Sequence, residues 1–389
     1  MAAKSDNGRQ PIDEHDQHWD RHGHNVKLES YFRALVKQDA SDLHLKADSP
    51  PHVRIKGELR PTKSDPLSGD EIEEMARELM TDKQAAYFDE HGSIDVAHEL
   101  TGSDRFRINV FRQRGEISVS VRRVERAIPD FEDLHLPEIL AKISLDHQGL
   151  ILLAGPTGSG KSTTIASMIQ HINRNRRCHI VTIEDPIEFT HVDNKALVNQ
   201  REIGIDVPSF EMALKYLMRE DPDVVLIGEM RDAETFQAAL QASETGHLVF
   251  GTVHASSAAQ TIGRILDLFS AESRELIRQS LAFNLKSIIC QKLLPSIEEG
   301  IDRVPAVEIL ISNPSVKQFI SEKRDQEINE VISGHEREGM ITFTSSLLRL
   351  IDQELVDPRV AYEVAPNPDE LKMRMRGIST GQAGFTGGR

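Results

Sequence analysis

A glycine-rich segment at residues 155–162 has the spacing of a phosphate-binding loop. It fits the pattern G-x-x-x-x-G-K-[ST] and directly follows the apolar run 150–154. Glycines let backbone N–H groups turn around a β-phosphate, and a helix beginning at Lys161 would point its positive end at the same anion. Lys161 would reach the β- and γ-phosphates, and the Ser162 hydroxyl would bind Mg²⁺. We therefore expect ATP and Mg²⁺ as cofactors, with the nucleotide bound by Gly155, Pro156, Thr157, Gly158, Ser159, Gly160, Lys161, Ser162 and Thr163.

Two acidic residues, Glu184 and Asp185, follow the apolar run 179–183. In a parallel sheet, carboxylates at the carboxyl end of a neighbouring strand face the crevice where a nucleotide binds. Glu184 would hold the attacking water, and Asp185 would bind the water shell of the metal. The alternative is that two acids before a proline form only a turn.

Glu229 follows a third apolar run, 224–227, and is also a candidate on the magnesium side. It lies past the strand and not on it, which places it slightly farther from the metal, at a distance that a water would bridge. Spacing alone leaves open whether Glu184 or Glu229 is the general base. We favour Glu184 for water activation and Glu229 for the metal.

His254 ends a fourth apolar run, 248–253, on the edge where the ligand is expected. It would sense the γ-phosphate or relay its presence to a neighbour. The alternative is a histidine that only makes structural hydrogen bonds.

Arginines gather on a hairpin that is predicted from two alternating runs, 106–111 and 117–121. Only Glu116 opposes them locally. One interpretation is a solvated strand face, and the other is arginine fingers that reach phosphate across a subunit boundary and stabilise transition-state charge. These arginines are Arg105, Arg107, Arg112, Arg114, Arg122 and Arg123.

The four apolar runs that position the candidate site are each about one strand long and alternate with helix-length segments. This alternation predicts a parallel sheet with helices on both faces. The chain from about residue 290 to 376 is expected to be mostly helical.

An α+β module precedes this sheet. Apolar spacing over 28–36 predicts a helix, and 42–46 and 52–56 alternate as strands do. Ser68 and Glu71 have capping-box spacing at the start of a further helix. With the arginine-bearing hairpin, the module closes near Val124.

The two ends of the chain are expected to be tails. Residues 1–25 are polar and would be disordered, although their histidines could instead bind a metal. These are His15, His18, His22 and His24, around Trp19. Residues 377–389 are rich in glycine and would be flexible.

Composition narrows the class of protein. The 389 residues carry a net charge of −16, so a main role in binding nucleic acid is not expected. Two cysteines suit a reducing compartment, for which the cytoplasm is the default. The apolar runs are far shorter than the roughly 18–20 residues of a membrane-spanning helix.

Several motifs in order make the chain resemble the pilus-retraction, or twitching-motility, ATPases of the PilT/PilU group in the type II/IV secretion ATPase superfamily. The resemblance spans about residues 28–376. The segments that carry it are Ser41–Leu45 with Pro50-Pro51, Gly155–Thr163, Thr182–Phe189, Arg219–Asp223 with Gly228–Asp232, and Glu244–Ala255.

The resemblance implies a PAS-like N-terminal domain over 26–127, a linker over 128–136 and a RecA-like ATPase domain over 137–376 with a helical C-terminal part. It implies a homo-hexamer with ATP at subunit boundaries, where Arg105, Arg107, Arg122 and Arg123 become finger candidates. It further implies that the ring acts on the inner-membrane platform protein of a type IV pilus, at the cytoplasmic face of that membrane.

Two departures from the family's pattern bear on the role. The retraction motif A-I-R-N-L-I-R-E corresponds here to Ser315–Glu322, where Lys317 keeps a charge and Ser321 loses one. The segment Gly204–Glu211 looks more like the accessory PilU branch. An accessory ring component with weak or dependent activity, working with a second retraction ATPase, is therefore the alternative, as is a secretion-system ATPase of the superfamily.

Overall fold

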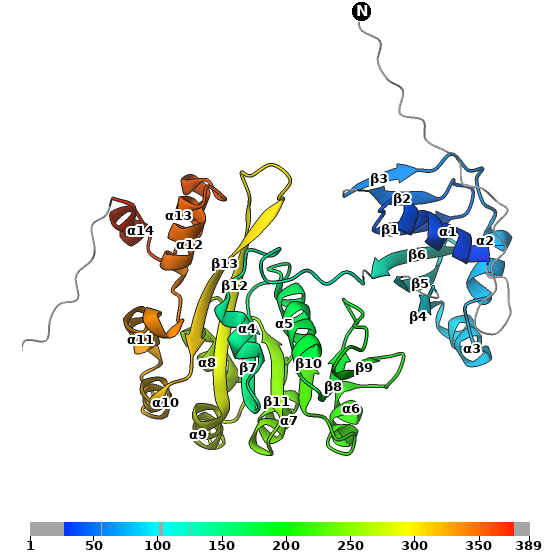
Figure 1. The fold of residues 1–389 in the computed structure, drawn as a ribbon. Coiled ribbons are helices and arrows are strands. Elements are labelled where there is room, and N and C mark those ends of the chain that lie inside the picture. The colour runs from blue at the N-terminus through cyan, green and yellow to red at the C-terminus, as the bar shows by residue number, and fades with distance from the viewer. Residues whose placement is uncertain (1–26, 56, 101–103, 125, 377–389) are drawn as a thin grey trace, which may run out of the picture. The chain divides into compact units, whose positions relative to one another are not determined.

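The computed structural model describes residues 27–55, 57–100, 104–124 and 126–376, and the predicted tails 1–25 and 377–389 lie outside these ranges. The chain divides into two compact units. One comprises residues 1–127 with 187–190, and the other residues 128–186 with 191–389. Each unit contains its own sheet (Figure 1).

The N-terminal unit is an antiparallel sheet of six strands with helices packed against its apolar face. The strand order is β3-β2-β1-β6-β5-β4. Side chains from every helix and from most strands form one core, because alternate strand residues turn to the same face. The elements are α1 (Lys27–Lys37), β1 (Asp42–Lys46), β2 (His52–Ile55), β3 (Glu58–Pro61), α2 (Gly69–Arg77), α3 (Asp82–His91), β4 (Ser93–Glu99), β5 (Arg105–Gln113) and β6 (Glu116–Val124).

The structure confirms the predicted capping box and the predicted hairpin of this unit. Ser68 accepts a hydrogen bond from the Glu71 N–H, and the Glu71 side chain accepts one from the Ser68 N–H, which completes the capping box of α2. The hairpin of β5 and β6 turns at Arg114 and Gly115, both with positive φ. Strands β3 and β4 and helix α3 were not among the predicted elements.

The second unit is a seven-stranded sheet of order β13-β12-β7-β11-β10-β8-β9. All neighbours pair in parallel except β12 and β13, which confirms the predicted parallel arrangement of the four apolar runs. The strands are β7 (Gly149–Ala154), β8 (His179–Glu184), β9 (Leu197–Glu202), β10 (Val224–Ile227), β11 (Leu248–Val253), β12 (Leu285–Pro295) and β13 (Arg303–Ile311).

Helices cover both faces of this sheet, and two separate cores result. Leu150 and Leu152 of β7 pack with α6, α7, α8 and α9, whereas Ile151 and Leu153 pack with α4 and α5. These helices are α4 (Ile139–Ser144), α5 (Lys161–Asn175), α6 (Phe210–Leu217), α7 (Ala233–Glu244), α8 (Ala258–Asp267) and α9 (Arg274–Asn284).

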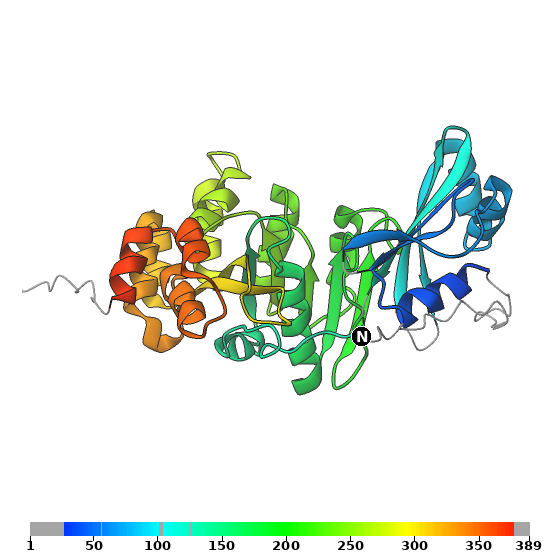
Figure 2. The same cartoon turned by 90° about the horizontal axis from the view of Figure 1, so that it is seen from above.

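The predicted helical C-terminal part begins only at Pro314, because residues 285–311 form the antiparallel pair β12 and β13. The helices that follow gather at the β13 end of the sheet, coloured orange to red in Figures 1 and 2. They are α10 (Pro314–Ser321), the short η1 (Asp325–Glu327), α11 (Ile328–Gly334), the short η2 (Glu336–Glu338), α12 (Phe343–Asp352), α13 (Pro358–Val364) and α14 (Pro368–Met375).

Candidate nucleotide-binding site

The glycine-rich loop connects β7 to α5, as its sequence pattern requires. Two of its glycines are needed for space as well as for their positive φ. A Cβ at Gly155 would lie 2.5 Å from the carbonyl oxygen of Gln291, and one at Gly160 would lie 2.7 Å from the Gln291 side-chain nitrogen. The loop is thus packed tightly on β12.

Two polar side chains of the loop turn into it. Lys161 Nζ donates hydrogen bonds to the carbonyls of Gly155, at 2.8 Å, and Pro156, at 3.0 Å. Burial lowers the pKa of Lys161, and the Glu229 charge opposes that shift. Ser159 Oγ is buried with no hydrogen-bond partner among the described residues. A buried ammonium and a buried unpaired hydroxyl in a backbone cradle fit a phosphate group.

The other predicted loop residues lie at the surface of this cradle. Pro156, Thr157 and Gly158 are exposed, as is Ser162 in the first turn of α5, and Thr163 is half-buried. Ser162 is therefore accessible to a metal that would accompany the nucleotide.

Gln291 on β12 holds the loop and was not among the predicted site residues. Its side-chain nitrogen donates to the Ser159 carbonyl at 2.8 Å, and its side-chain oxygen accepts from the Thr164 hydroxyl at 2.8 Å. It is 3% exposed. Gln291 lies 127 residues after Thr164, so no sequence pattern near the loop predicts that it holds the loop. The only signal in the sequence is that Gln291 is a polar residue in an otherwise largely apolar strand.

Glu184 lies at the carboxyl end of β8, where it was predicted. Its Oε1 accepts hydrogen bonds from the Thr182 hydroxyl at 2.7 Å and from the Gln200 amide at 3.1 Å. Asp185 follows directly and is exposed. Gly228, at the end of β10, donates its N–H to the Ile183 carbonyl at 2.8 Å, so the ends of β8 and β10 are adjacent.

Glu229 and His254 are brought together by the ends of β10 and β11. His254 Nε2 donates to Glu229 Oε1 at 2.9 Å, and Arg231 donates to Glu229 Oε2 at 2.5 Å. The Arg231 hydrogen bond is the main cause that lowers the pKa of Glu229; burial opposes it, and the His254 bond adds to the lowering. The strands β7, β11, β10 and β8 are parallel neighbours, so their carboxyl ends lie side by side. The glycine-rich loop, Glu184, Glu229 and His254 therefore lie at the same end of the sheet.

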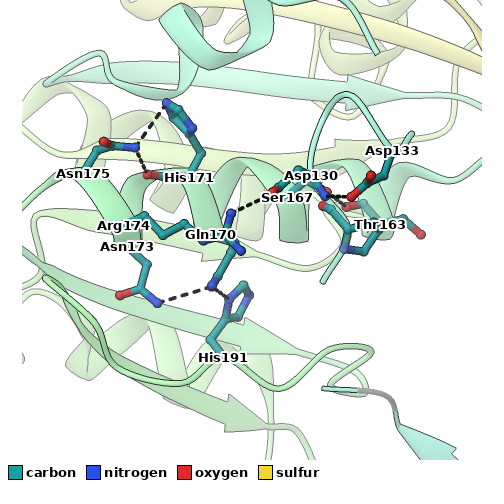
Figure 3. A network of polar contacts seen from close by, with 11 residues as sticks. Asp130, Asp133, Thr163, Ser167, Gln170, His171, Asn173, Arg174, Asn175 and His191 are labelled. Carbon is teal, nitrogen blue, oxygen red and sulfur yellow. Dashed lines mark hydrogen bonds and ion pairs between the residues drawn. The ribbon is translucent and has the colours of Figure 1, made fainter. Parts of the chain in front are cut away.

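Helix α5, which follows the loop, is fastened along its length (Figure 3). Ser167 Oγ donates to the Pro129 carbonyl at 2.8 Å, and Arg174 pairs with Asp130. On another side, Asn173 donates to the Val192 carbonyl at 2.8 Å. These contacts attach the helix whose first turn carries Lys161 and Ser162 to the segments around residues 129–130 and 192.

The four arginine-finger candidates lie in the N-terminal unit. Arg105 and Arg107 alternate with buried residues of β5. Arg122 of β6 lies opposite Arg107 in the antiparallel pair. These three arginines are therefore on the sheet face away from the core. Arg122 donates to Asp42 at 2.9 Å and its side chain is 64% exposed. Arg123 is 13% exposed and pairs with Asp104 and Asp39. Their role as fingers stays a prediction.

Comparison with known families identifies the chain. The sequence model of the family described as Type II/IV secretion system protein matches residues 25–354. The chain belongs to this family. No helix in the part of the chain that the structure describes combines the length and the apolar character needed to cross a membrane.

Within the family, the chain is similar to proteins of known name. It is 42% identical to the type IV pilus retraction ATPase PilT of Pseudomonas aeruginosa over 86% of this chain and 97% of that protein. It is 36% identical to the type IV pilus ATPase PilU of the same organism over 90% of this chain and 92% of that protein. A crystal structure of the pilus retraction motor PilT with bound ADP matches with a TM-score of 0.81 and 42% identity, over 88% of this chain and 98% of that one.

Proposed function

We propose that this chain is an ATP-hydrolysing motor that powers retraction of a type IV pilus, as a member of a family whose relatives are ATPases. The observation that carries the proposal is the meeting of Lys161, Glu184 and Glu229 at one edge of the parallel sheet. The match to a retraction ATPase over nearly its whole length supports the pilus as the object of the motor.

The residues of the chain have distinct parts in the proposed hydrolysis. Lys161 would exchange its loop carbonyls for phosphate oxygens and stabilise their charge. Glu184 would accept a proton from water as the water oxygen bonds to the γ-phosphorus. The bond to the β,γ-bridging oxygen breaks, ADP keeps its electron pair, and phosphate leaves. His254 and Glu229 would form a hydrogen-bonded pair beside the γ-phosphate, and this pair would respond to the loss of that phosphate.

Mg²⁺ would neutralise charge on the phosphate oxygens when bound. Among the described residues, no three His, Cys, Asp or Glu side chains come together as a metal site. That fits a magnesium ion that arrives with the nucleotide, since Mg²⁺ is commonly bound by phosphates, waters and one or two protein groups. Ser162 would hold it directly, with Asp185 and Glu229 acting through water.

The assembly belongs to the same proposal. We infer a homo-hexamer with ATP at subunit boundaries, built from an N-terminal domain over 26–127, a linker over 128–136 and an ATPase domain over 137–376. Arg105, Arg107, Arg122 and Arg123 are the finger candidates. The ring would work in the cytoplasm on a platform protein at the inner face of the membrane, without nucleic acid.

An accessory role is the second candidate, and the identity to PilU together with the altered segment Ser315–Glu322 favours it. Phosphate release by the purified chain separates the two, because an accessory protein would hydrolyse little ATP alone. A second retraction ATPase added to the assay would then raise the rate.

The proposal is tested by Lys161→Ala, with the exposed Lys195→Ala as its matched control. Lys161→Ala should abolish phosphate release and Lys195→Ala should leave it unchanged. In cells, deletion of the gene should stop twitching, and the wild-type gene but not the Lys161→Ala gene should restore it. Normal twitching in the deletion strain would overturn the pilus role, while equal rates in the two variants would overturn the ATPase site.

A further inference from the structure

Gln200 of β9 contacts the residue that we assign as general base. In the parallel pair of β8 and β9, Gln200 is in register with Thr182, and Glu184 lies two residues further along β8 on the same face as Thr182. The Gln200 side chain therefore lies beside both. Its Nε2 donates to Glu184 Oε1 at 3.1 Å, and Thr182 Oγ1 donates to the same oxygen at 2.7 Å.

The orientation of the Gln200 amide is determined by a second contact. The backbone N–H of His191 donates to Gln200 Oε1 at 2.7 Å. A backbone N–H can only donate, so the amide oxygen must face His191 and the NH₂ group must face Glu184. The side chain is thereby fixed as a donor to the carboxylate.

His191 is itself fixed on the helix that follows the phosphate loop. Its ring Nδ1 lies 3.4 Å from Gln170 Oε1 on α5. Figure 3 shows this contact between His191 and Gln170. A continuous set of contacts therefore runs from α5 through His191 and Gln200 to Glu184. The carboxylate is held relative to the same helix that carries Lys161 in its first turn.

We propose that Gln200 is a positioning residue for ATP hydrolysis, which fixes the Glu184 carboxylate where it receives the proton of the attacking water. This inference rests on the proposed function, because it assumes that Glu184 is the base. We expect Gln200 to act on the chemical step, because it hydrogen-bonds to the Glu184 carboxylate and to the His191 N–H.

The chain offers a matched pair of variants on adjacent residues of β9. Gln200→Glu keeps the shape and the acceptor for His191, but it replaces the donor by a carboxylate facing Glu184. Asn199→Asp makes the same chemical change one residue away, on the opposite face, where Asn199 contacts His179 at 2.8 Å. Gln200→Met, which removes both the donor to Glu184 and the acceptor for the His191 N–H without adding charge, is the second test variant.

The measurement is steady-state phosphate release together with ADP affinity. Gln200→Glu and Gln200→Met should lower kcat roughly 10- to 100-fold, the cost of a misplaced catalytic group, with KM for ATP and ADP affinity within about 2-fold of wild type. Asn199→Asp should keep wild-type kcat. Unchanged ADP binding also verifies that the variants are folded, since a structural defect would raise KM as well.

Two outcomes would overturn the proposal: a kcat of both Gln200 variants equal to that of Asn199→Asp, or a loss that falls on KM and ADP affinity instead. Glu184→Gln separates this failure from failure of the proposed base. If Glu184→Gln turns over at the wild-type rate, the base assignment is wrong. If Glu184→Gln is inactive while the Gln200 variants are fully active, only the positioning role is wrong.

Discussion

His254 Nε2 lies 2.9 Å from Glu229 Oε1, and this contact connects the ends of the neighbouring strands β10 and β11. The Thr252 hydroxyl donates to the Gly228 carbonyl at 2.6 Å just before it, so the two strand ends are fastened twice. A change at the nucleotide that moves Glu229 would therefore also move His254.

Removal of the imidazole should slow turnover. His254→Ala takes one of the two donors from Glu229 and leaves Arg231 alone to orient it, so we expect phosphate release to fall roughly 10-fold with little change in ADP affinity. His247→Ala is the control, because His247 precedes β11 and its ring contacts the Ala242 carbonyl. Equal rates in the two variants would contradict a role for His254 at the site.

Loss of the Gln291 amide should weaken nucleotide binding. Gln291→Leu leaves the buried Ser159 carbonyl and Thr164 hydroxyl without this partner, and the loop would lose its fixed shape. We expect ADP affinity to fall roughly 10-fold, since an unsatisfied buried group costs about 1–3 kcal/mol. Thr164→Val, which breaks only one of the two hydrogen bonds, should have a smaller effect in the same calorimetric titration. Wild-type affinity in Gln291→Leu would exclude this role.

Stability should fall in acid because of His191. Burial lowers the pKa of this histidine from its ordinary value of about 6.5 to about 4, so the unfolded chain binds the proton first. The free energy of unfolding is unaffected above the unfolded pKa and decreases as the pH falls from there towards 4, by about 2 kcal/mol between pH 7 and pH 5. Urea unfolding at the two pH values measures it. His191→Asn should reduce this pH dependence. An unchanged pH dependence in that variant would show that His191 is not its cause.

The C-terminal helices should depend on the ion pair between the buried Arg278 and the half-buried Asp325. Arg278 of α9 donates to both carboxylate oxygens of Asp325, at 2.6 and 2.9 Å, and to the Ile320 carbonyl at 2.9 Å. Arg278→Ala should destabilise the fold by about 3 kcal/mol in urea unfolding, because Asp325 keeps a charge with no counterpart there.

Two comparisons make that expectation specific. Arg359→Ala removes an arginine that is 86% exposed and paired with Asp357, and it should change stability little. The double variant Arg278→Met with Asp325→Leu should recover much of the loss, because no unpaired charge remains. A loss in the double variant as large as in Arg278→Ala would assign the effect to packing instead.

Local signals were sufficient for the parts of the site that lie close together in the chain. The spacing of Gly155, Gly160 and Lys161 after an apolar run predicts the loop, and an acid at the end of a parallel strand predicts Glu184 and Glu229. The arginine-bearing hairpin and the capping box at Ser68 follow in the same way. In each case the backbone conformation depends on residues that are close together in the sequence.

Strands β12 and β13 show where such signals end. The run Leu285–Pro295 is buried along most of its length, so it lacks the alternation of a half-buried strand, and it directly follows α9. An apolar stretch of this kind reads equally well as a buried helix. Only its pairing with β7 and with β13 decides that it is extended.

The sequence by itself determined that this chain has a glycine-rich loop between a strand and a helix of a parallel sheet, because those conformations follow from neighbouring residues. The tertiary structure alone decided which distant side chains complete the site. Gln291 reaches the loop from another strand, and Gln200 reaches Glu184 from β9. The physical reason is that a hydrogen bond depends on distance in space, which strand order and register set and local spacing does not.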